Sequence, residues 1–272
     1  MSDKQRGAQR ALVLIAAGLF ATAAQAQEGL IQPGNEYFKL NLGGVLTTNN
    51  ANIRIDGTTR TGTDFDLEGV TGLKDSASTF FAQGSWRFLP RHRIGITYFG
   101  IDRDRTVAID REITIGDTVI PINTSLKTEA KTQFFITNYM YSFIKNEDLE
   151  LAGIFGLYGA NYKYKFTASS PIINIDKSTT APLPVLGLAA DFYLSPRWTV
   201  SVFGEGLKVK VGDVDGSMYS AGISTDYMIT RTWGVGLGYQ VADVKVDSTK
   251  SDFNGHLSWR MDGYFAYLQA RF

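Results

Sequence analysis

The sequence of 272 residues contains no cysteine and only two histidines. A chain without cysteine forms no disulfides and cannot be anchored as a lipoprotein, so an exported protein of this composition must find its stability elsewhere. The formal net charge is +0, which argues against nucleic-acid binding through a bulk excess of positive charge. We therefore expect no nucleic-acid partner.

Long apolar runs are also absent beyond residue 26. No later segment approaches the roughly 20 apolar residues that a membrane-spanning helix needs. Lipid admits only helices and closed barrels as spanning structures, because both satisfy their backbone hydrogen bonds internally. At 44% hydrophobic and 20% charged residues, the chain is too apolar to be disordered over most of its length. If the mature protein lies in a membrane, it must cross it as β-strands.

The first 26 residues have the pattern of a secretory signal peptide. They begin with three basic residues, Lys4, Arg6 and Arg10. An apolar run over residues 11–24 follows, and Ala24 and Ala26 frame a small-x-small cleavage site. A retained amino-terminal helix is the alternative. We expect cleavage after Ala26, which leaves residues 27–272 as a single exported domain.

The rest of the chain is built of segments in which apolar and polar side chains alternate. Alternation with a period of two places successive side chains on opposite faces of a strand. Segments of about ten residues with this pattern, bounded by turn residues, are typical of transmembrane β-strands. We expect ten strands, over residues 36–46, 79–89, 92–103, 129–144, 149–166, 183–194, 198–211, 218–229, 233–245 and 259–272.

The connections between these strands alternate in length. Short turns are expected near residues 90, 146, 196 and 231. Mostly longer and more polar connections are expected near residues 60, 116, 174, 214 and 252. Short turns that alternate with long loops are typical of outer-membrane barrels, whose turns face the periplasm. An even number of strands then places both termini in the periplasm.

Three polar segments are predicted to be loops, over residues 47–78, 167–182 and 246–258. A fourth, charged segment still alternates. Its halves, residues 106–115 and 119–127, flank Gly116-Asp117, a dipeptide with good turn chemistry. We expect a hairpin there that rises beyond the membrane.

The final segment has the clearest alternation. One of its faces carries Tyr264, Ala266, Leu268, Ala270 and Phe272. An exposed edge strand of this kind would promote aggregation, so we expect it to pair with residues 36–46 and close a barrel, with these five side chains facing lipid. A terminal Phe after alternating aromatic residues also resembles the assembly signal of bacterial outer-membrane barrels.

The signal peptide, the alternating strands and residues 264–272 together resemble small Gram-negative outer-membrane β-barrel proteins. The resemblance covers the whole mature chain at the level of architecture. It implies an all-β fold, a closed antiparallel transmembrane β-barrel of about ten strands (eight is the alternative). It also implies outer-membrane lipid, lipopolysaccharide and the barrel-assembly machinery as partners. A soluble β-sandwich also alternates, but the signal peptide and the final Phe272 disfavour it.

The polar faces of the strands supply candidate lumen residues. A barrel of about eight strands is filled by its own side chains, whereas about sixteen strands leave a channel. Ten strands therefore imply a mostly plugged interior or a narrow water path, in which charges must pair or stay hydrated. The lumen candidates are Lys39, Asn41, Arg87, Asp191, Glu205, Asp226, Gln240, Gln269 and Arg271.

Residues with catalytic potential are few. His256-Leu257-Ser258 has the His-x-Ser spacing of an outer-membrane lipid A deacylase, but no Glu follows, and Asp262 is the carboxylate nearby. Ten-stranded outer-membrane proteases carry acidic pairs and an Asp-x-His pattern. Here Asn254 stands two residues before His256, although acidic pairs occur near the rim, Asp102/Asp104 and Asp213/Asp215. We therefore expect no catalytic, cofactor or metal site.

These observations favour a non-enzymatic barrel with a structural or surface-interaction role, and the barrel fold itself does not choose among functions. A narrow passive channel for small solutes is the alternative, and a lipid A deacylase or a protease is disfavoured. Mixed charges at the rim, in residues 102–105 and 110–112, could bind the phosphates of lipopolysaccharide through arginine or through bridging divalent cations.

Overall fold

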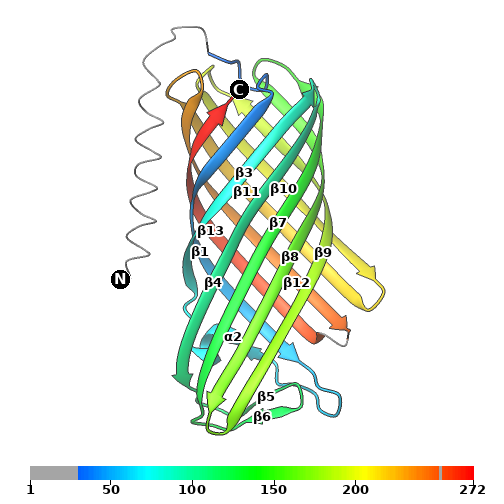
Figure 1. Ribbon diagram of the computed structural model, residues 1–272. Helices are drawn as coiled ribbons and strands as arrows, with labels where there is room; N and C mark the ends of the chain where they lie inside the picture. Colours follow the sequence, from blue (N-terminus) through cyan, green and yellow to red (C-terminus); the bar gives the residue numbers. More distant parts are fainter. Residues whose placement is uncertain (1–29, 251–252) are drawn as a thin grey trace.

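The computed structural model describes residues 30–250 and 253–272. Ten long strands pair in chain order around an antiparallel ring, and β1 closes it against β13 (Figure 1). They are β1 (Phe38–Ile55), β3 (Ser76–Leu89), β4 (His92–Ala108), β7 (Ser125–Lys145), β8 (Leu149–Ser169), β9 (Ile172–Tyr193), β10 (Trp198–Val211), β11 (Val214–Met228), β12 (Trp233–Thr249) and β13 (Asn254–Arg271). The prediction of a closed antiparallel barrel of ten strands is confirmed.

The segment predicted to be a signal peptide, including Ala24 and Ala26, lies outside the described residues. Within the described part of the chain, no helix is long and apolar enough to cross a membrane. The helix α2 (Leu67–Thr71) has only five residues.

The two ends of the barrel differ. The turn end, at the top of Figure 1, carries the carboxy-terminus and the four connections that join β3 to β4, β7 to β8, β9 to β10 and β11 to β12. The opposite end, which we name the loop end, holds α2 and three short strands, β2 (Phe65–Asp66), β5 (Ile113–Ile115) and β6 (Thr118–Ile120). The strands β5 and β6 pair around Gly116-Asp117 as expected, although residues 106–108 and 125–127 belong to β4 and β7 instead.

Two of the predicted loops are strands. Residues 167–182 continue β8 and β9, which pair as far as Ser169 and Ile172. Most of residues 246–258 continues β12 and β13 in the same way. The polar composition that suggested loops has another cause: beyond the membrane belt the outer face of a strand meets water, so its outward side chains are polar.

Large apolar side chains that remain exposed form a belt around the turn-end half of the barrel. Every strand of the ring contributes to it; examples are Leu42, Phe80, Tyr98, Phe135, Leu157, Leu188, Trp198, Ile223, Leu237 and Tyr264. Exposed apolar area on this scale marks a surface that is covered in the native setting. A belt that encircles a closed barrel has the form expected of a lipid-facing surface.

The closing seam joins β1 to β13 from Lys39 and Arg271 to Ile55 and Gly255. The last residue belongs to this ladder, because the Phe272 amide donates to the Phe38 carbonyl at 2.9 Å. Four of the five side chains predicted to face lipid are exposed, Tyr264, Ala266, Leu268 and Phe272. Ala270 shares their face but is covered, since Leu40 and Trp233 lie beside it in the two neighbouring strands.

Replacing Phe272 by alanine, or deleting it, is expected to lower the amount of assembled barrel more than the stability of the barrel that does assemble. The side chain is 57% exposed, so its removal costs few internal contacts, whereas an assembly signal would be lost. The amount of folded protein in the outer-membrane fraction measures the first effect, and thermal unfolding measures the second. Phe38→Ala, on the same outer surface, is the matched control. Normal amounts of the deleted protein in the membrane would contradict the assembly signal.

Candidate functional site

The turn-end half of the lumen contains a buried ion-pair network centred on Glu150. The Arg87 guanidinium donates to both carboxylate oxygens, each at 2.9 Å. The hydroxyls of Tyr193, at 2.6 Å, and Ser142 also donate to this carboxylate. Glu150 is 1% exposed. Such a paired and hydrogen-bonded arrangement is what a buried charge requires.

Two further ion pairs cross the lumen beside this network. The Arg93 guanidinium lies 3.2 Å from an Asp191 carboxylate oxygen. Asp226 lies between two cations, with Lys39 Nζ at 3.8 Å and an Arg271 nitrogen at 3.7 Å. These pairs join strands from different sides of the ring, so they brace the interior as well as fill it.

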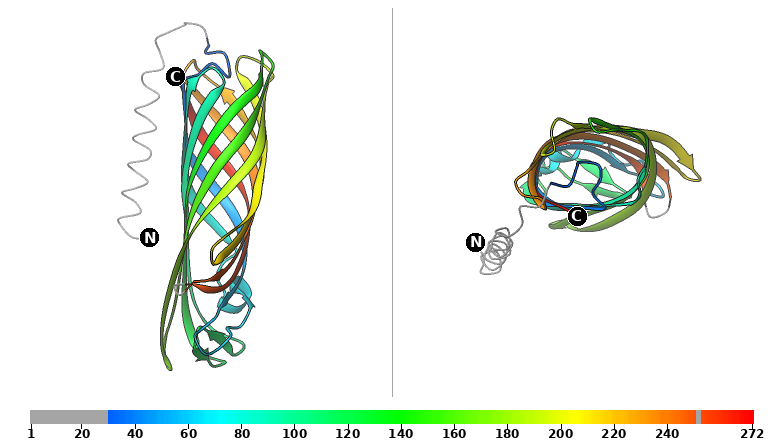
Figure 2. Two further views of the ribbon diagram at one scale, coloured as in Figure 1. Left: turned by 90° about the vertical axis from the view of Figure 1, so that its right-hand side faces the viewer. Right: turned by 90° about the horizontal axis from the view of Figure 1, so that it is seen from above.

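Residues 33–36 cover the mouth of the turn end, and Figure 2 shows this segment crossing it. Pro33, Gly34 and Glu36 are buried, and Lys145 Nζ donates to the Gly34 carbonyl at 2.7 Å. Gly34 has φ 82°, and a Cβ there would lie 2.5 Å from the Tyr193 hydroxyl. Only glycine fits this conformation and this close approach, so the sequence allows the segment to lie directly on the network.

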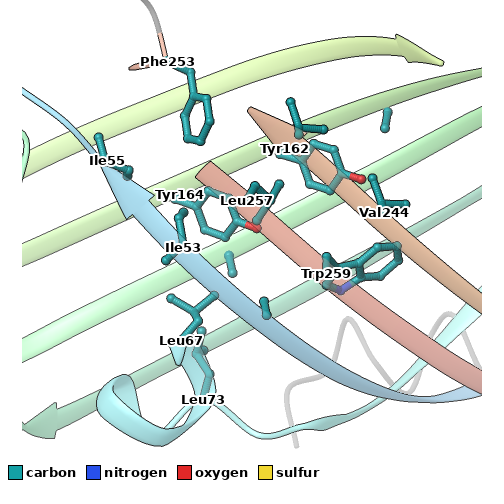
Figure 3. Close-up of a cluster of buried hydrophobic side chains, with 14 of the residues drawn as sticks. Ile53, Ile55, Leu67, Leu73, Tyr162, Tyr164, Val244, Phe253, Leu257 and Trp259 are labelled. Carbon is teal, nitrogen blue, oxygen red and sulfur yellow. The ribbon is translucent and has the colours of Figure 1, made fainter. Parts of the chain in front are cut away.

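Apolar side chains fill the loop-end half of the lumen. They come from strands around the ring and from the segment containing α2, and Figure 3 labels Ile53, Ile55, Leu67, Leu73, Tyr162, Tyr164, Val244, Phe253, Leu257 and Trp259. Trp259 stacks on Phe134 with ring centroids 5.2 Å apart and meets Tyr162 edge-on at 6.3 Å. Close-packed aromatic rings therefore occupy this part of the bore.

The short helix α2 packs against the core through Leu67 and Val70, and hydrogen bonds hold both of its ends and the side chain of Glu68. The Asp66 side chain accepts from the Gly69 amide at 3.1 Å, which caps the first turn. Glu68 accepts from the Arg103 guanidinium at 2.6 Å and from the Ala51 amide at 2.8 Å. Arg103 is one of the rim charges considered from sequence as able to bind phosphate, but its side chain is 7% exposed and pairs with Glu68.

The loops over the barrel are fastened to each other at Asp117. Its carboxylate accepts hydrogen bonds from the amides and hydroxyls of Thr58 and Thr59, at 2.8–3.0 Å. These bonds favour the charged form and hold the pKa of Asp117 well below its usual range. The β5–β6 turn and the loop that follows β1 therefore form one lid.

A chamber of about 230 Å³ remains between the two closures. Six of the nine predicted lumen residues line it, Lys39, Asn41, Asp191, Glu205, Asp226 and Gln240. The other three are buried in the turn-end networks. Arg87 binds Glu150, Arg271 Nε donates to the Gln269 amide oxygen at 2.7 Å, and Gln269 donates in turn to Asn41 at 3.1 Å.

The sequence-based prediction missed lumen residues that carry contacts of the networks. Arg93, Glu150 and Tyr158 all point inward. The alternation of strand faces predicts these inward positions. For example, Leu149 and Leu151 flank Glu150 and belong to the outward face, so Glu150 belongs to the inward face. The charged partners of these residues, Asp191, Arg87 and Glu205, are 47 to 98 residues away in the sequence, and local spacing does not reveal such distant contacts.

His256 does have a carboxylate partner, from the neighbouring strand. Its Nδ1 lies 2.7 Å from an Asp247 oxygen, and the two residues face each other in the β12–β13 register. Asp262, the carboxylate considered from sequence, is a register partner of Val241 instead. Leu257 points into the core, so His256 and Ser258 point outward. In the described part of the chain no hydrogen bond joins Ser258 to His256, and a nucleophile needs its base within reach.

Of the two acidic pairs, one lies near His256, because Asp215 faces Asp247 in the β11–β12 register and Asp247 faces His256. Asp102 and Asp104 belong to β4, whereas Asp213 and Asp215 lie at the β10–β11 turn, on another side of the ring. A protease site would require these groups to converge on one water or one peptide bond. Within residues 30–250 and 253–272, no three Asp, Glu or His side chains come together as a metal site.

No protein-family model matches this sequence, and no curated protein matches it either. Among solved structures, the barrel is similar to the outer membrane protease OmpT from Escherichia coli. The TM-score is 0.58 and the identity 10%, over 91% of this chain and 100% of that chain. At this identity the likeness shows the fold alone: the chain has the fold of an outer-membrane β-barrel.

Two further matches have lower scores. Ail, the attachment invasion locus protein of Yersinia pestis, gives a TM-score of 0.37 and 12% identity over 84% of this chain and 98% of that chain. The toluene transporter TodX of Pseudomonas putida gives 0.35 and 7% over 89% and 93%. With TM-scores below 0.5, these two structures differ too much from the barrel to indicate its function.

Proposed function

We propose that this protein is a non-conducting, non-enzymatic barrel of the bacterial outer membrane that acts through the surface of its loop end. The turn end and both termini face the periplasm, and the apolar belt lies in lipid. Assembly into the membrane uses the barrel-assembly machinery, which reads the final strand.

The observation that carries this proposal is the double closure of the lumen. At the turn end, the network of Arg87 and Glu150 lies under residues 33–36. At the loop end, the aromatic core around Trp259 and the inserted α2 fill the bore. A conducting pore needs a continuous hydrated path, and these two layers interrupt it at opposite ends.

The outer surface beyond the belt suits lipopolysaccharide. On β7 and β8, the outward residues change from Phe135 and Leu157 to Lys131, Lys163 and Lys165, all of them exposed. Lys131 and Lys163 face each other in the strand register. The ammonium groups of these lysines lie just beyond the apolar belt, where they can bind the phosphates of lipid A. Their position is the observation that supports lipopolysaccharide as a partner.

The alternative of a narrow passive channel is favoured by the chamber between the closures. Planar-bilayer recording of the purified barrel separates the two functions. We expect no openings for the unmodified protein, because ions meet a dry core at one end. Regular openings of uniform conductance would contradict the proposal.

A control variant shows that the recording can detect an open bore. In it, Gly-Ser linkers replace residues 33–36 and residues 57–74, which contain α2, alanine replaces Trp259, and serine replaces both Arg87 and Glu150. Removing both closures is expected to produce openings. The variant is used only if its heat-dependent electrophoretic mobility shows a folded barrel.

A further inference from the structure

Glu205 is a lumen carboxylate on which no arginine or lysine converges. It lies on the inner face of β10 and is 8% exposed. The Tyr158 hydroxyl donates to one of its oxygens, whereas the other, Oε2, is buried without a hydrogen-bond partner. Among the described residues, Glu150, Asp191 and Asp226 each have an arginine or lysine within 4 Å, and Glu205 has none.

The position of Glu205 is fixed by its neighbours. Gly187 faces it across β9 and β10, and a Cβ at Gly187 would lie 2.5 Å from the Cβ of Glu205. Tyr158 holds the first carboxylate oxygen from β8, the strand beyond β9 in the ring. The second oxygen has no partner of its own, and Glu205 lines the chamber.

The rest of the chamber wall combines polar side chains, with Lys39 and Arg93 held in ion pairs by Asp226 and Asp191, and aromatic and apolar ones. Phe81, Phe99, Phe203, Phe265 and Tyr267 line it together with aliphatic side chains. Phe81 and Phe265 meet edge to face, with ring centroids 5.9 Å apart. A carboxylate beside aromatic faces is the combination that binds organic cations, through charge and through cation–π attraction.

The pairing of neighbouring strands is interrupted next to this residue. Pairing between β9 and β10 ends at Leu186 and Gly206, and beyond this point the tips of the β8–β9 and β10–β11 hairpins stand apart (Figures 1 and 2). Pro182 and Pro184 follow on β9, and proline has no N–H with which to extend a ladder. Leu186 is exposed in the apolar belt, so the separation begins at the edge of the lipid-facing surface.

We propose that the chamber binds a small organic cation, an ammonium compound with an apolar body, whose charged group lies against Glu205. A buried carboxylate without a cation is costly, and such a ligand supplies the missing charge while its body covers the aromatic wall. This inference is independent of the role of the loop-end surface.

Benzylamine, which is charged at neutral pH, is a probe small enough for the chamber. Titration calorimetry is done on the full barrel in a neutral maltoside detergent, with benzyl alcohol and benzoate as matched neutral and anionic probes. We expect saturable binding of benzylamine, and binding of the other two weaker by about tenfold or more, as for the loss of a charge-assisted contact.

The variant Glu205→Gln keeps the shape and the contact with Tyr158 and removes the charge. It is expected to weaken benzylamine binding by about tenfold or more while leaving the weak binding of benzyl alcohol unchanged. Glu129→Gln, which removes a carboxylate from the outer face, is expected to bind benzylamine as the unmodified protein does. Equal binding of the charged and neutral probes, undiminished benzylamine binding by the Glu205→Gln variant, or no binding of benzylamine at millimolar concentration would each overturn the proposal.

Discussion

Replacing Glu150 by alanine is expected to destabilise the barrel by about 3–5 kcal/mol, the cost of breaking a buried ion pair by removing one partner. The Arg87 guanidinium would lose both of its 2.9 Å bonds to carboxylate oxygens. Its side chain is 5% exposed, so water cannot replace them. The hydroxyls of Tyr193 and Ser142 would lose the same acceptor. Unfolding in denaturant, followed by tryptophan fluorescence in detergent, measures the change.

A control variant distinguishes the loss of the ion pair from the loss of a negative charge alone. Glu147→Ala removes an equal charge from the turn before β8 and is expected to change stability by less than about 0.5 kcal/mol. The double variant Arg87→Met/Glu150→Leu is expected to recover most of the loss, because two apolar side chains leave no charge unpaired. A single Glu150→Ala variant as stable as the Glu147→Ala variant would show that the network does not hold the turn end.

The sequence predicts the outward and inward faces of the strands well, and β8 shows why. Its outward residues include Phe155 and Leu157 near the turn end and Lys163 and Lys165 farther on, all at the same parity. The inward side chain of Tyr162 lies close to these two lysines in sequence and joins the apolar core. The period of two therefore continues along the whole strand. The outward face, however, changes from apolar to charged and the inward face becomes apolar, and this change marks the point where the strand leaves lipid.

Strand ends were harder to predict because this exchange resembles the start of a loop. A prediction based on outward apolar residues ends each strand at the edge of the apolar belt. In the structure β8 continues to Ser169 and β9 begins at Ile172. Once water covers the outer face, the apolar side chains turn to the inside of the barrel. The same exchange explains why α2 inserts: a bore lined with apolar side chains must be filled by apolar residues.

The partners in the lumen could not be predicted from spacing. Glu150 meets Arg87 across 63 residues, and Asp247 meets His256 through the register of β12 with β13. Both contacts depend on which strands are neighbours or lie opposite each other in the ring. They also depend on the register, because a shift of one residue would move each side chain to the other face of its strand. Residue types and faces are local properties of the sequence, whereas these pairings are properties of the closed barrel.

Replacing Trp259 by alanine is expected to cost about 3–5 kcal/mol, the range for removing a large buried aromatic side chain. Trp259 is 3% exposed and packs between Phe134 and Tyr162. The surrounding strands are held by the closed ladder, so they can collapse only partly into the space. The cavity would lie beneath α2, and unfolding in denaturant, followed by circular dichroism, measures the loss.

A second measurement locates the effect of this substitution. If the aromatic core holds the lid of the loop end in place, Trp259→Ala should also make residues 57–64 more susceptible to limited proteolysis under native conditions. Tyr264→Ala, on the outer face of the same strand, removes a ring that is 67% exposed, and it should leave both the stability and the cleavage pattern nearly unchanged. Equal losses for the two variants would mean that the core around Trp259 does not close the bore, and the proposal of a non-conducting barrel would lose its loop-end support.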